Sequence, residues 1–447
     1  MINRIQRKLT PPQILVLGFL LIILTGAFLL CLPIASKDRI WTGFFDSLFT
    51  ATSATCVTGL IVFDTYTHWS LFGQFVILGM IQIGGIGFMT VLSLFAVFLK
   101  RRIGLQERRL LMQSAGSMRI GGIVRLIKRI ALGTLLFEGA GSLALAFRFC
   151  REMDFWEGLY NAVFHAVSAF CNAGFDLMGK KAPFSSLTSY AGDPLVNITI
   201  MLLIVIGGLG FIVWDDLYAC RFHFRKYSTH SKMVLIMTTF LIFAGALSFF
   251  FLEKSHSFQG MPLGKRILAS FFQSITSRTA GFNTADLAQL SESGSLLTSL
   301  LMMIGGSPGS TAGGIKTTTV FVLLMDTIAS SQRISHINLF KRRIDSDTVK
   351  QASAIITIYL TAALAAVILI CAWEPYTIRE VLFEVASAIG TVGLSMGLTP
   401  SLSALSRALL ILLMFGGRIG GLTLVMTIAE RKEHVPVERP AEKIIVG

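Results

Sequence analysis

The segment FEVASAIGTVG, which runs from Phe383 to Gly393, ends a short apolar stretch on a glycine. Three further segments have the same arrangement, each with a phenylalanine ten residues before its final glycine. They are FTATSATCVTG (Phe49 to Gly59), FHAVSAFCNAG (Phe164 to Gly174) and FFQSITSRTAG (Phe271 to Gly281). The final glycines are 115, 107 and 112 residues apart. Such regular spacing is typical of a structural unit that is repeated along the chain.

The composition is that of a membrane protein rather than a soluble one. The chain has 447 residues, of which 53% are hydrophobic and 14% charged, and its mean hydropathy is +0.70. In an average soluble domain about 25% of residues are charged. A net charge of +14 would suit a nucleic-acid-binding protein, but the lysines and arginines fall in short clusters between apolar runs. That pattern is typical of cytoplasmic loops, so we expect a polytopic membrane protein that binds no nucleic acid.

Eight apolar runs are each long enough for a transmembrane helix, which needs about 20 residues. They cover residues 13–33, 71–99, 127–150, 195–218, 233–252, 296–328, 352–373 and 404–429. Shorter, partly apolar segments lie within successive pairs of runs, at 43–53, 156–169, 264–275 and 378–388. They are too short to cross a bilayer and are typical of re-entrant half-helices. The predicted fold class is an all-α polytopic membrane protein, with eight transmembrane helices in four helix–pore-loop–helix repeats and pseudo-fourfold symmetry around one pore.

The four repeats divide almost the whole chain. They are predicted at residues 1–100, 101–220, 221–345 and 346–430, with an intramembrane loop at 305–316 and a cytoplasmic tail at 431–447. The linkers between repeats are rich in lysine and arginine, whereas those within repeats carry mixed charge. Because basic loops stay on the cytoplasmic side, both termini are expected inside the cell and all four half-helices open from outside.

Glycine-ended loops after four half-helices can form a pathway for an alkali cation. Glycine permits backbone angles that turn successive carbonyls towards one axis, and carbonyl rings of this kind replace the hydration shell of the ion in potassium channels. A single glycine after a short helix is ordinarily only a helix cap, but four in one register favour the pathway. The predicted ion-binding residues are Val57, Thr58, Gly59, Asn172, Ala173, Gly174, Thr279, Ala280, Gly281, Thr391, Val392 and Gly393.

A second glycine motif follows each loop, as IGGIGF (83–88), IGGLGF (206–211), IGGSPG (304–309) and FGGRIG (415–420). In the third copy the sequence continues as GGSPGSTAGGIKTTT, from Gly305 to Thr319, which cannot form a regular helix through lipid. We predict a flexible intramembrane loop that obstructs the pathway, with a packed helix kink as the alternative. The loop is not a phosphate-binding P-loop, because Ile315 separates Gly314 from Lys316.

Arg418 lies in the middle of the last apolar run. An unpaired charge there costs at least about 2.5–3.5 kcal/mol, so the side chain should face a cavity or a partner. It is expected to line the pathway, where it would repel cations, or to bond the carbonyls of the 305–316 loop. An ion pair with Glu138 or Asp326 is the alternative. The predicted gate residues are Gly305, Gly306, Ser307, Gly309, Ser310, Gly313, Gly314, Lys316 and Arg418.

The motifs TCVTG, CNAG, RTAGFNT and GTVGLSMGLTP resemble those of the Trk/Ktr/HKT superfamily of potassium transporters. The stretches LTPPQ, GLIVFDT, FGQFVILGMIQIGGIGFMTV, GDPLVN and MFGGRIGGLT are most similar to the Ktr branch, the ion-translocating membrane subunits. The resemblance covers essentially the whole chain. It implies that Gly59, Gly174, Gly281 and Gly393 select K+, since plant relatives that prefer sodium have serine at the first of these positions.

The resemblance also implies partners and a location. Subunits of this family form homodimers in the cell (plasma or inner) membrane, on a cytoplasmic ring of nucleotide-binding RCK (KTN) proteins that gate them. K+ is then the transported ion, Na+ is a candidate activator, and the chain itself holds no organic cofactor. The family has a gating loop and an arginine at the places of 305–316 and Arg418.

Two other classes of function fit the sequence less well. A secondary transporter of another cation or small solute is the main alternative, but such carriers usually have two repeats with broken helices. A membrane-embedded enzyme would need a cluster of catalytic residues, and none is evident, so we predict no enzymatic activity. Glu138, Asp215 and Asp216 are candidate sites for a coupling ion, although helix ends and buried pairs explain them as well.

Overall fold

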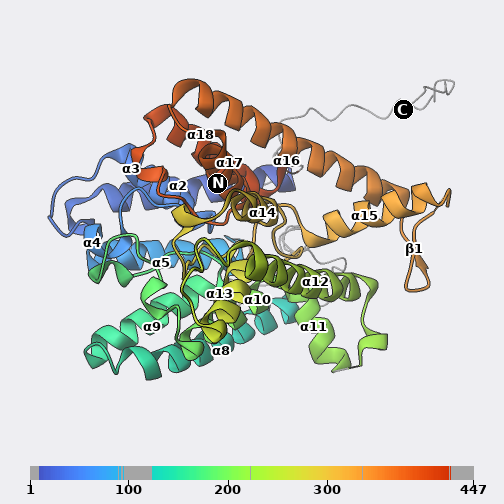
Figure 1. Cartoon of the computed structure of the whole chain (residues 1–447), viewed down its shortest axis with the longest axis horizontal. Helices are drawn as coiled ribbons and strands as arrows, with labels where there is room; N and C mark the ends of the chain where they lie inside the picture. Colours follow the sequence, from blue (N-terminus) through green and yellow to red (C-terminus); the bar gives the residue numbers. More distant parts are fainter. Residues whose placement is uncertain are drawn as a thin grey trace.

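The computed structural model describes residues 10–88, 90, 91, 94, 123–221, 223–334, 336–421 and 423. The described chain is mainly α-helical, with one small hairpin in which β1 (Asn338–Leu339) pairs with β2 (Arg342–Arg343) in antiparallel register. Figure 1 shows the long helices running along the long axis of the molecule, with the hairpin at one end and α3 and α4 at the other. The basic linker at 95–122 and the predicted tail at 431–447 lie outside the described residues.

The helices follow one another in four similar groups, each with a long helix, a short helix and a second helix. The groups are α2 (Pro11–Cys31), α3 (Phe44–Thr55) and α5 (Leu71–Ile86); α8 (Ile123–Phe149), α9 (Phe155–Phe170) and α10 (Pro194–Gly208); α12 (Thr229–Leu252), α13 (Leu263–Thr276) and α14 (Glu292–Met303); and α16 (Ser346–Trp373), α17 (Ile378–Gly390) and α18 (Ala404–Ile419). The remaining helices are α4 (Thr65–His68), α11 (Phe211–Cys220) and α15 (Thr317–Ser331). Short 3-10 segments are η1 (Pro33–Ala35), η2 (Met178–Lys180), η3 (Thr188–Tyr190), η4 (Phe224–Lys226), η5 (Leu287–Gln289) and η6 (Thr399–Ser401).

The four short helices agree with the predicted half-helices, which began and ended within two residues of them. Within each group the short helix packs against the long one. Between groups, the second helix packs against the short helix of the next group: α5 on α9, α10 on α13, α14 on α17, and α18 back on α3. The groups therefore close into a circuit, with the short helices inside it.

Four described helices are long and apolar enough to cross a membrane, namely Pro12–Cys31, Val124–Phe149, Thr229–Leu252 and Ser346–Trp373. A fifth span is counted if α10 and α11 are taken together, although they are bent by 94°. The predicted span over 195–218 is therefore divided into two helices rather than formed by one continuous helix. The chain turns at Leu209 and Gly210, where Gly210 has a φ of +93° that glycine adopts without the cost it has for other residues.

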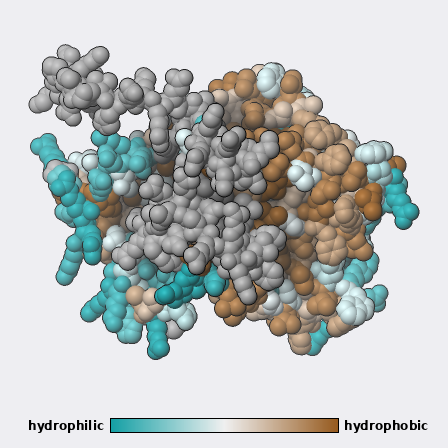
Figure 2. All heavy atoms as spheres, turned by 180° about the vertical axis from the view of Figure 1, so that it is seen from behind, coloured by the Kyte–Doolittle hydropathy of each residue, from teal (hydrophilic) through white to brown (hydrophobic). Residues whose placement is uncertain are grey.

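The outer faces of the long helices are apolar. Leu21, Leu143, Phe240 and Ile368, one on each of α2, α8, α12 and α16, are 61–73% exposed. Figure 2 shows apolar side chains over a broad band, with hydrophilic side chains gathered towards the ends of the long axis. Soluble monomers rarely expose a continuous apolar surface of this extent. The band is consistent with contact between these helices and lipid tails.

Carboxylates tie the end of a long helix to the start of a second helix. Glu253, fully buried after α12, accepts hydrogen bonds from the Ser291 hydroxyl (2.6 Å) and backbone N–H (3.2 Å) at the start of α14. Glu374, after α16, accepts from the Ser403 N–H and the Ser406 hydroxyl, both at 2.9 Å, at the start of α18. These bonds, from Ser403 first, lower the pKa of the Glu374 carboxyl below its usual value. The ties fix α14 and α18 relative to the long helices of their own groups.

Glycines let the second helices approach the ends of the short helices. A Cβ atom on Gly84, Gly207 or Gly417 would overlap a backbone carbonyl oxygen four residues before a loop glycine. These oxygens belong to Thr55, Phe170 and Ile389. Contact at this distance is possible only where no side chain intervenes.

The same contact corrects one detail of the predicted repeat. Aligning FGGRIG with IGGIGF by their first glycines places Gly416 opposite Gly84, whereas the structure places Gly417 there. The chain also turns three residues after each contact glycine, at positive φ at Gly87, Gly210 and Gly420. Arg418 therefore occupies the position that glycine holds in the first two groups.

Alanine at Gly417 should destabilise the protein, whereas alanine at the adjacent Gly416 should not. A Cβ at Gly417 would overlap the Ile389 carbonyl, while a Cβ at Gly416 would have no described atom within 4 Å apart from its chain neighbours and the backbone of its own helix. Overpacking of this kind costs about 1–3 kcal/mol, and alanine in an open helical position gains about 0.5–1 kcal/mol over glycine. The thermal unfolding midpoints of the two purified variants measure the difference. Equal midpoints would contradict the close contact between α17 and α18.

Candidate functional site

The four predicted loop glycines lie next to one another in a closed ring. A Cβ built on Gly59 would lie 3.2 Å from the Cα of Gly174, and one on Gly174 would lie 2.9 Å from the Cα of Gly281. The corresponding distances are 3.3 Å from Gly281 to Gly393 and 2.8 Å from Gly393 back to Gly59. The structure thus brings together four residues that are more than 100 positions apart in successive pairs.

No side chain other than hydrogen fits at these positions without displacing the neighbouring loop. A Cβ on Gly174 would lie 2.8 Å from the carbonyl oxygen of Ala280, and Cβ atoms on the other three would come closer still to Ala173, Val392 and Thr58 oxygens. Each glycine meets an oxygen of the loop that comes next along the chain, and Gly393 of the last loop meets an oxygen of the first. Each glycine therefore packs against the main chain of the next loop.

The loop backbone alternates in conformation. The glycines have φ values of 93°, 69°, 80° and 91°, and the residues two positions earlier also have positive φ. Those residues are Val57 (58°), Asn172 (60°), Thr279 (92°) and Thr391 (53°). The residue between each pair is outside the left-handed region. Alternation of this kind turns successive peptide planes so that their carbonyls face one side, and it costs about 1–2 kcal/mol at each residue that has a Cβ.

Hydroxyl groups at the ends of the short helices support this backbone. The Ser53 hydroxyl accepts from the N–H of Gly59 and the Ser387 hydroxyl from that of Gly393, both at 3.0 Å. The Ser168 hydroxyl donates to the Phe175 carbonyl at 2.7 Å. These bonds tie each loop to the helix before it and compensate in part for the strained angles.

The third loop reaches the same position with a tighter turn. In the other loops the N–H of the residue before the glycine bonds the carbonyl of Ser53, Ser168 or Ser387, each at 2.8 Å. In the third loop Ala280 bonds Thr276 at 2.9 Å, one residue closer in sequence. The Thr276 hydroxyl then donates to the Phe282 carbonyl at 2.6 Å, as Ser168 does to Phe175. The substitution of Ile275-Thr276 for Ser-Ala in the sequence is explained by this shift.

The predicted intramembrane break lies between α14 and α15. The chain leaves α14 at Met303 and enters α15 at Thr317, and it is irregular between them. The two ends of this loop meet, since Gly305 N–H bonds the Ile315 carbonyl (2.9 Å) and Thr317 N–H bonds that of Gly306 (3.0 Å). Inside it, Lys316 Nζ donates to the carbonyls of Ala312 (2.6 Å) and Gly313 (3.4 Å). The loop is therefore a closed, internally bonded unit rather than a kink.

The loop packs against the ring on the side of the residues that precede the glycines. Thr311, fully buried, donates from its hydroxyl to the Phe170 carbonyl (3.1 Å) and accepts from Asn172 Nδ2 (2.9 Å). Its N–H donates to the Gly207 carbonyl at 3.2 Å. A Cβ on Gly313 would overlap the hydroxyl oxygen of Thr391. The loop thus contacts the second and fourth ring segments directly.

Sequence reasoning named most of this loop but missed Thr311. It selected the glycines, Ser307, Ser310 and Lys316, whereas Thr311 makes the contacts with Asn172 and Phe170. Its sequence context, one hydroxyl among several in SPGST, does not distinguish it. The buried Arg278 in the third ring segment has no basic counterpart in the other three segments. It donates to the Gly305 carbonyl at 3.4 Å and so also contacts the loop between α14 and α15.

Arg418 bonds backbone carbonyls. Its Nη1 donates to the Thr311 carbonyl, and its Nη2 donates to those of Gly84 and Gly85, the latter at 3.1 Å. One of the two predicted arrangements, pairing with the loop carbonyls, is therefore present. Within the described part of the chain, Arg418 forms no ion pair with a carboxylate. The guanidinium joins α18, α5 and the loop.

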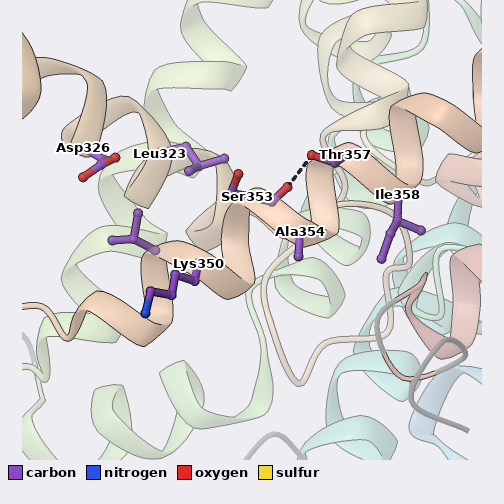
Figure 3. A pocket seen from close by; sticks show the side chains of 8 residues that line it. Leu323, Asp326, Lys350, Ser353, Ala354, Thr357 and Ile358 are labelled. Carbon is purple, nitrogen blue, oxygen red and sulfur yellow. Dashed lines mark hydrogen bonds between the residues drawn. The ribbon is translucent and has the colours of Figure 1, made fainter. Parts of the chain in front are cut away.

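The carboxylates considered as partners for Arg418 lie elsewhere. Glu138 accepts from Gln82 Nε2 at 3.1 and 3.2 Å. Asp326 lines an open pocket of about 630 Å³ between α15 and α16, which Figure 3 shows together with the bond from the Thr357 hydroxyl to the Ser353 carbonyl (2.9 Å).

The remaining acidic candidates have structural partners. Asp215 pairs with Arg129, both about 42% exposed, and Asp216 accepts from Ser228 N–H at 3.1 Å. No group of three or more His, Cys, Asp or Glu residues that could hold a metal ion is found in the described part of the chain.

Comparison with known proteins places the chain among cation transporters. The family described as "TrkH: Cation transport protein" matches residues 13–435. The chain is 40% identical to "Ktr system potassium uptake protein B" of Bacillus subtilis, over 98% of this chain and 97% of the relative. It is 38% identical to "Potassium/sodium uptake protein NtpJ" of Enterococcus hirae, over 100% and 99%. The crystal structure of the potassium transporter TrkH from Vibrio parahaemolyticus shares the fold, with a TM-score of 0.73 and 20% identity over 93% of this chain and 83% of that one.

Proposed function

Because the chain belongs to the TrkH family of cation transport proteins, we propose that it is the ion-translocating membrane subunit of a Ktr/Trk-type potassium uptake system. The observation that carries this proposal is the closed ring of Gly59, Gly174, Gly281 and Gly393. Rings of main-chain oxygens can replace the water around a bare monovalent cation. Potassium is the ion in the names of the Bacillus subtilis and Enterococcus hirae relatives, and the second name adds sodium.

The selectivity filter in this proposal consists of the four loops, with K+ bound at the four ring glycines. Its other members are the residues that precede them: Val57, Thr58, Asn172, Ala173, Thr279, Ala280, Thr391 and Val392. The proposal is supported by the alternating backbone angles, which orient the carbonyls, and by the hydroxyls that fix the loops. Glycine at position 59, rather than serine, favours potassium over sodium.

Around the filter we place eight transmembrane helices in four repeats, with boundaries at 1–100, 101–220, 221–345 and 346–430. Each of the four long helices, α2, α8, α12 and α16, is by itself long and apolar enough to cross a membrane. The second helices of the four groups are shorter, since α5, α10 and α18 end beside a glycine turn (Gly87, Gly210 and Gly420) and α14 ends at the irregular loop after Met303. Non-helical backbone is tolerated at membrane depth where it faces protein or water. The closed circuit of contacts between groups supports pseudo-fourfold symmetry.

The loop between Met303 and Thr317 acts in this proposal as the gate. Arg418 stabilises the loop in the position that it has in the structure. The loop contacts the filter through Thr311, and Arg418 bonds the carbonyl of the same residue. A positive charge near the ion path also raises the energy of a passing cation, by about 4 kcal/mol at 4 Å for an effective dielectric constant of 20.

The wider assembly is also part of the proposal. The protein is placed in the plasma or inner membrane with both termini in the cytoplasm, as a homodimer on a ring of RCK (KTN) nucleotide-binding subunits. Two relatives from Bacillus subtilis are named as proteins B and D of a "Ktr system". A protein named as one member of a system is consistent with a partner subunit. In this assembly the chain carries K+, Na+ is a candidate activator, and the nucleotide belongs to the partner.

Expression of the protein should restore growth of a potassium-uptake-deficient bacterium in low-potassium medium. Growth rate and rubidium uptake, each against an empty vector, measure the effect. Gly416→Ala, which the structure predicts to be tolerated, serves as a positive control. Absence of both growth and rubidium uptake, with the protein present in the membrane, would contradict potassium transport.

Gly59→Ser should raise the permeability to sodium relative to potassium. A Cβ at this residue would overlap the Ala173 carbonyl oxygen, so the filter must widen or tilt. Competition between sodium and rubidium in uptake assays gives the ratio. Gly79→Ser is the matched control, because a Cβ there would have no described atom within 4 Å apart from its chain neighbours and the backbone of its own helix. An unchanged ratio in Gly59→Ser would count against the assigned filter.

Arg418→Ala should increase rubidium uptake several-fold without changing the sodium-to-potassium ratio. The variant removes one hydrogen bond to the loop, two hydrogen bonds to α5 and one positive charge near the path. Arg407→Ala is the matched control on the same helix, since Arg407 pairs with Asp46 at 2.7 Å and does not bond the loop. Uptake that stays at the wild-type level, at equal protein abundance, would refute the role of Arg418 as a barrier.

A further inference from the structure

The open pocket between α15 and α16 is lined by one acidic and one basic side chain. Its volume is about 630 Å³, within the range of about 300–1,000 Å³ that is usual for small-molecule sites. Asp326 comes from α15 and Lys350 from α16, and Figure 3 shows both towards one end of the pocket and Ile358 towards the other. The proposed ion pathway uses neither charge.

Neither charge is well satisfied within the chain. Among the described residues, Asp326 forms no hydrogen bond and no ion pair, although it is only partly exposed. A carboxylate that is partly withdrawn from water normally has a partner. Lys350 pairs with Asp347 at 3.7 Å, but both side chains are at least 73% exposed, and such a pair adds little stability. Both charges are therefore available to a ligand.

The pocket lies where the surface of α16 changes from polar to apolar. The first two turns of this helix expose polar side chains, whereas Leu360, Leu364 and Ile368 further along are 44–68% exposed. The residues of α16 that line the pocket fall between 349 and 358, at the boundary of these two regions. Since α16 is long and apolar enough to cross a membrane, this boundary corresponds to the level of the lipid headgroups.

From this arrangement we propose that the pocket binds a phospholipid whose headgroup carries both a phosphate and a primary ammonium, as in phosphatidylethanolamine. Lys350 pairs with the phosphate, and Asp326 accepts hydrogen bonds from the ammonium. Charge-assisted bonds of this kind are among the strongest that side chains make. The apolar lining residues Leu323 and Ile358 contact the start of the acyl chains.

The two charges favour this headgroup over the other common ones. An anionic headgroup without an ammonium, as in phosphatidylglycerol, brings a phosphate near Asp326 and supplies no partner for that carboxylate. The quaternary ammonium of phosphatidylcholine has no N–H group, so it cannot donate a hydrogen bond to Asp326. Because the proposed ion pathway shares none of these residues, lipid binding can be measured whether or not the chain transports potassium.

Native mass spectrometry of the purified protein, with one lipid titrated at a time, tests the site. Wild-type protein should bind its first phosphatidylethanolamine about tenfold more tightly than its first phosphatidylcholine, the difference expected for one charge-assisted hydrogen bond. Asp326→Asn should remove most of this preference, because a neutral amide attracts the ammonium less, and it should leave the affinity for phosphatidylcholine unchanged. Lys350→Gln should weaken the binding of both lipids equally, since both carry a phosphate.

Two variants outside the pocket serve as matched controls. Asp38→Asn removes an exposed carboxylate between η1 and α3, and Lys341→Gln removes an exposed ammonium in the β1–β2 hairpin. Both should keep the wild-type preference. Unchanged binding of phosphatidylcholine by Asp326→Asn shows that this variant is folded, so its loss of preference reports on the headgroup.

Equal affinities of wild-type protein for the two lipids, or a preference that survives in Asp326→Asn, would refute the site. A second copy of the chain is the other occupant to be tested. It would give equal lipid affinities and would protect Ser353→Cys, on the pocket wall, from maleimide until the oligomer is dissociated. The lipid site instead requires that phosphatidylethanolamine slows the labelling of this cysteine, above the wild-type background, more than phosphatidylcholine does.

Discussion

The packing of four glycines against one another is the constraint on which the structure depends. At each of these positions a methyl group would occupy the space of a neighbouring main-chain oxygen. The loops can therefore close into a ring only if all four residues lack a side chain. Since the ring closes in the order of the chain, the helical groups must be arranged in the same order around it, and the contacts between second and short helices follow this order.

The surrounding helices hold the strained loops in place. The short helices present serine or threonine hydroxyls to the loop backbone, and the second helices approach the short ones through glycine contacts. Carboxylates at the ends of α12 and α16 fix the starts of the second helices. The left-handed angles at Val57, Asn172, Thr279 and Thr391 persist because these contacts leave the loops little freedom.

Much of this architecture could be predicted from the sequence, because it depends on local patterns. Half-helices were readable from their length and apolar character, and the four loops from the regular spacing of phenylalanine and glycine. The turn at Gly210, the place of Gly417 and the role of Thr311 could not be read, since each depends on a contact between segments far apart in sequence. The role of Thr276 depends on its bonds to Ala280 and Phe282, the first of which makes the third loop one residue tighter than the others.

The bonds of Arg418 have a genetic consequence. Its partners are peptide oxygens of Thr311, Gly84 and Gly85, which every residue type possesses. A lost ion pair can be restored by exchanging the two charges, but a lost bond to the main chain offers no complementary side chain to exchange. Second-site suppressors of a substitution at this arginine should therefore alter the length or stiffness of the segment it holds, and no charge reversal elsewhere should replace it.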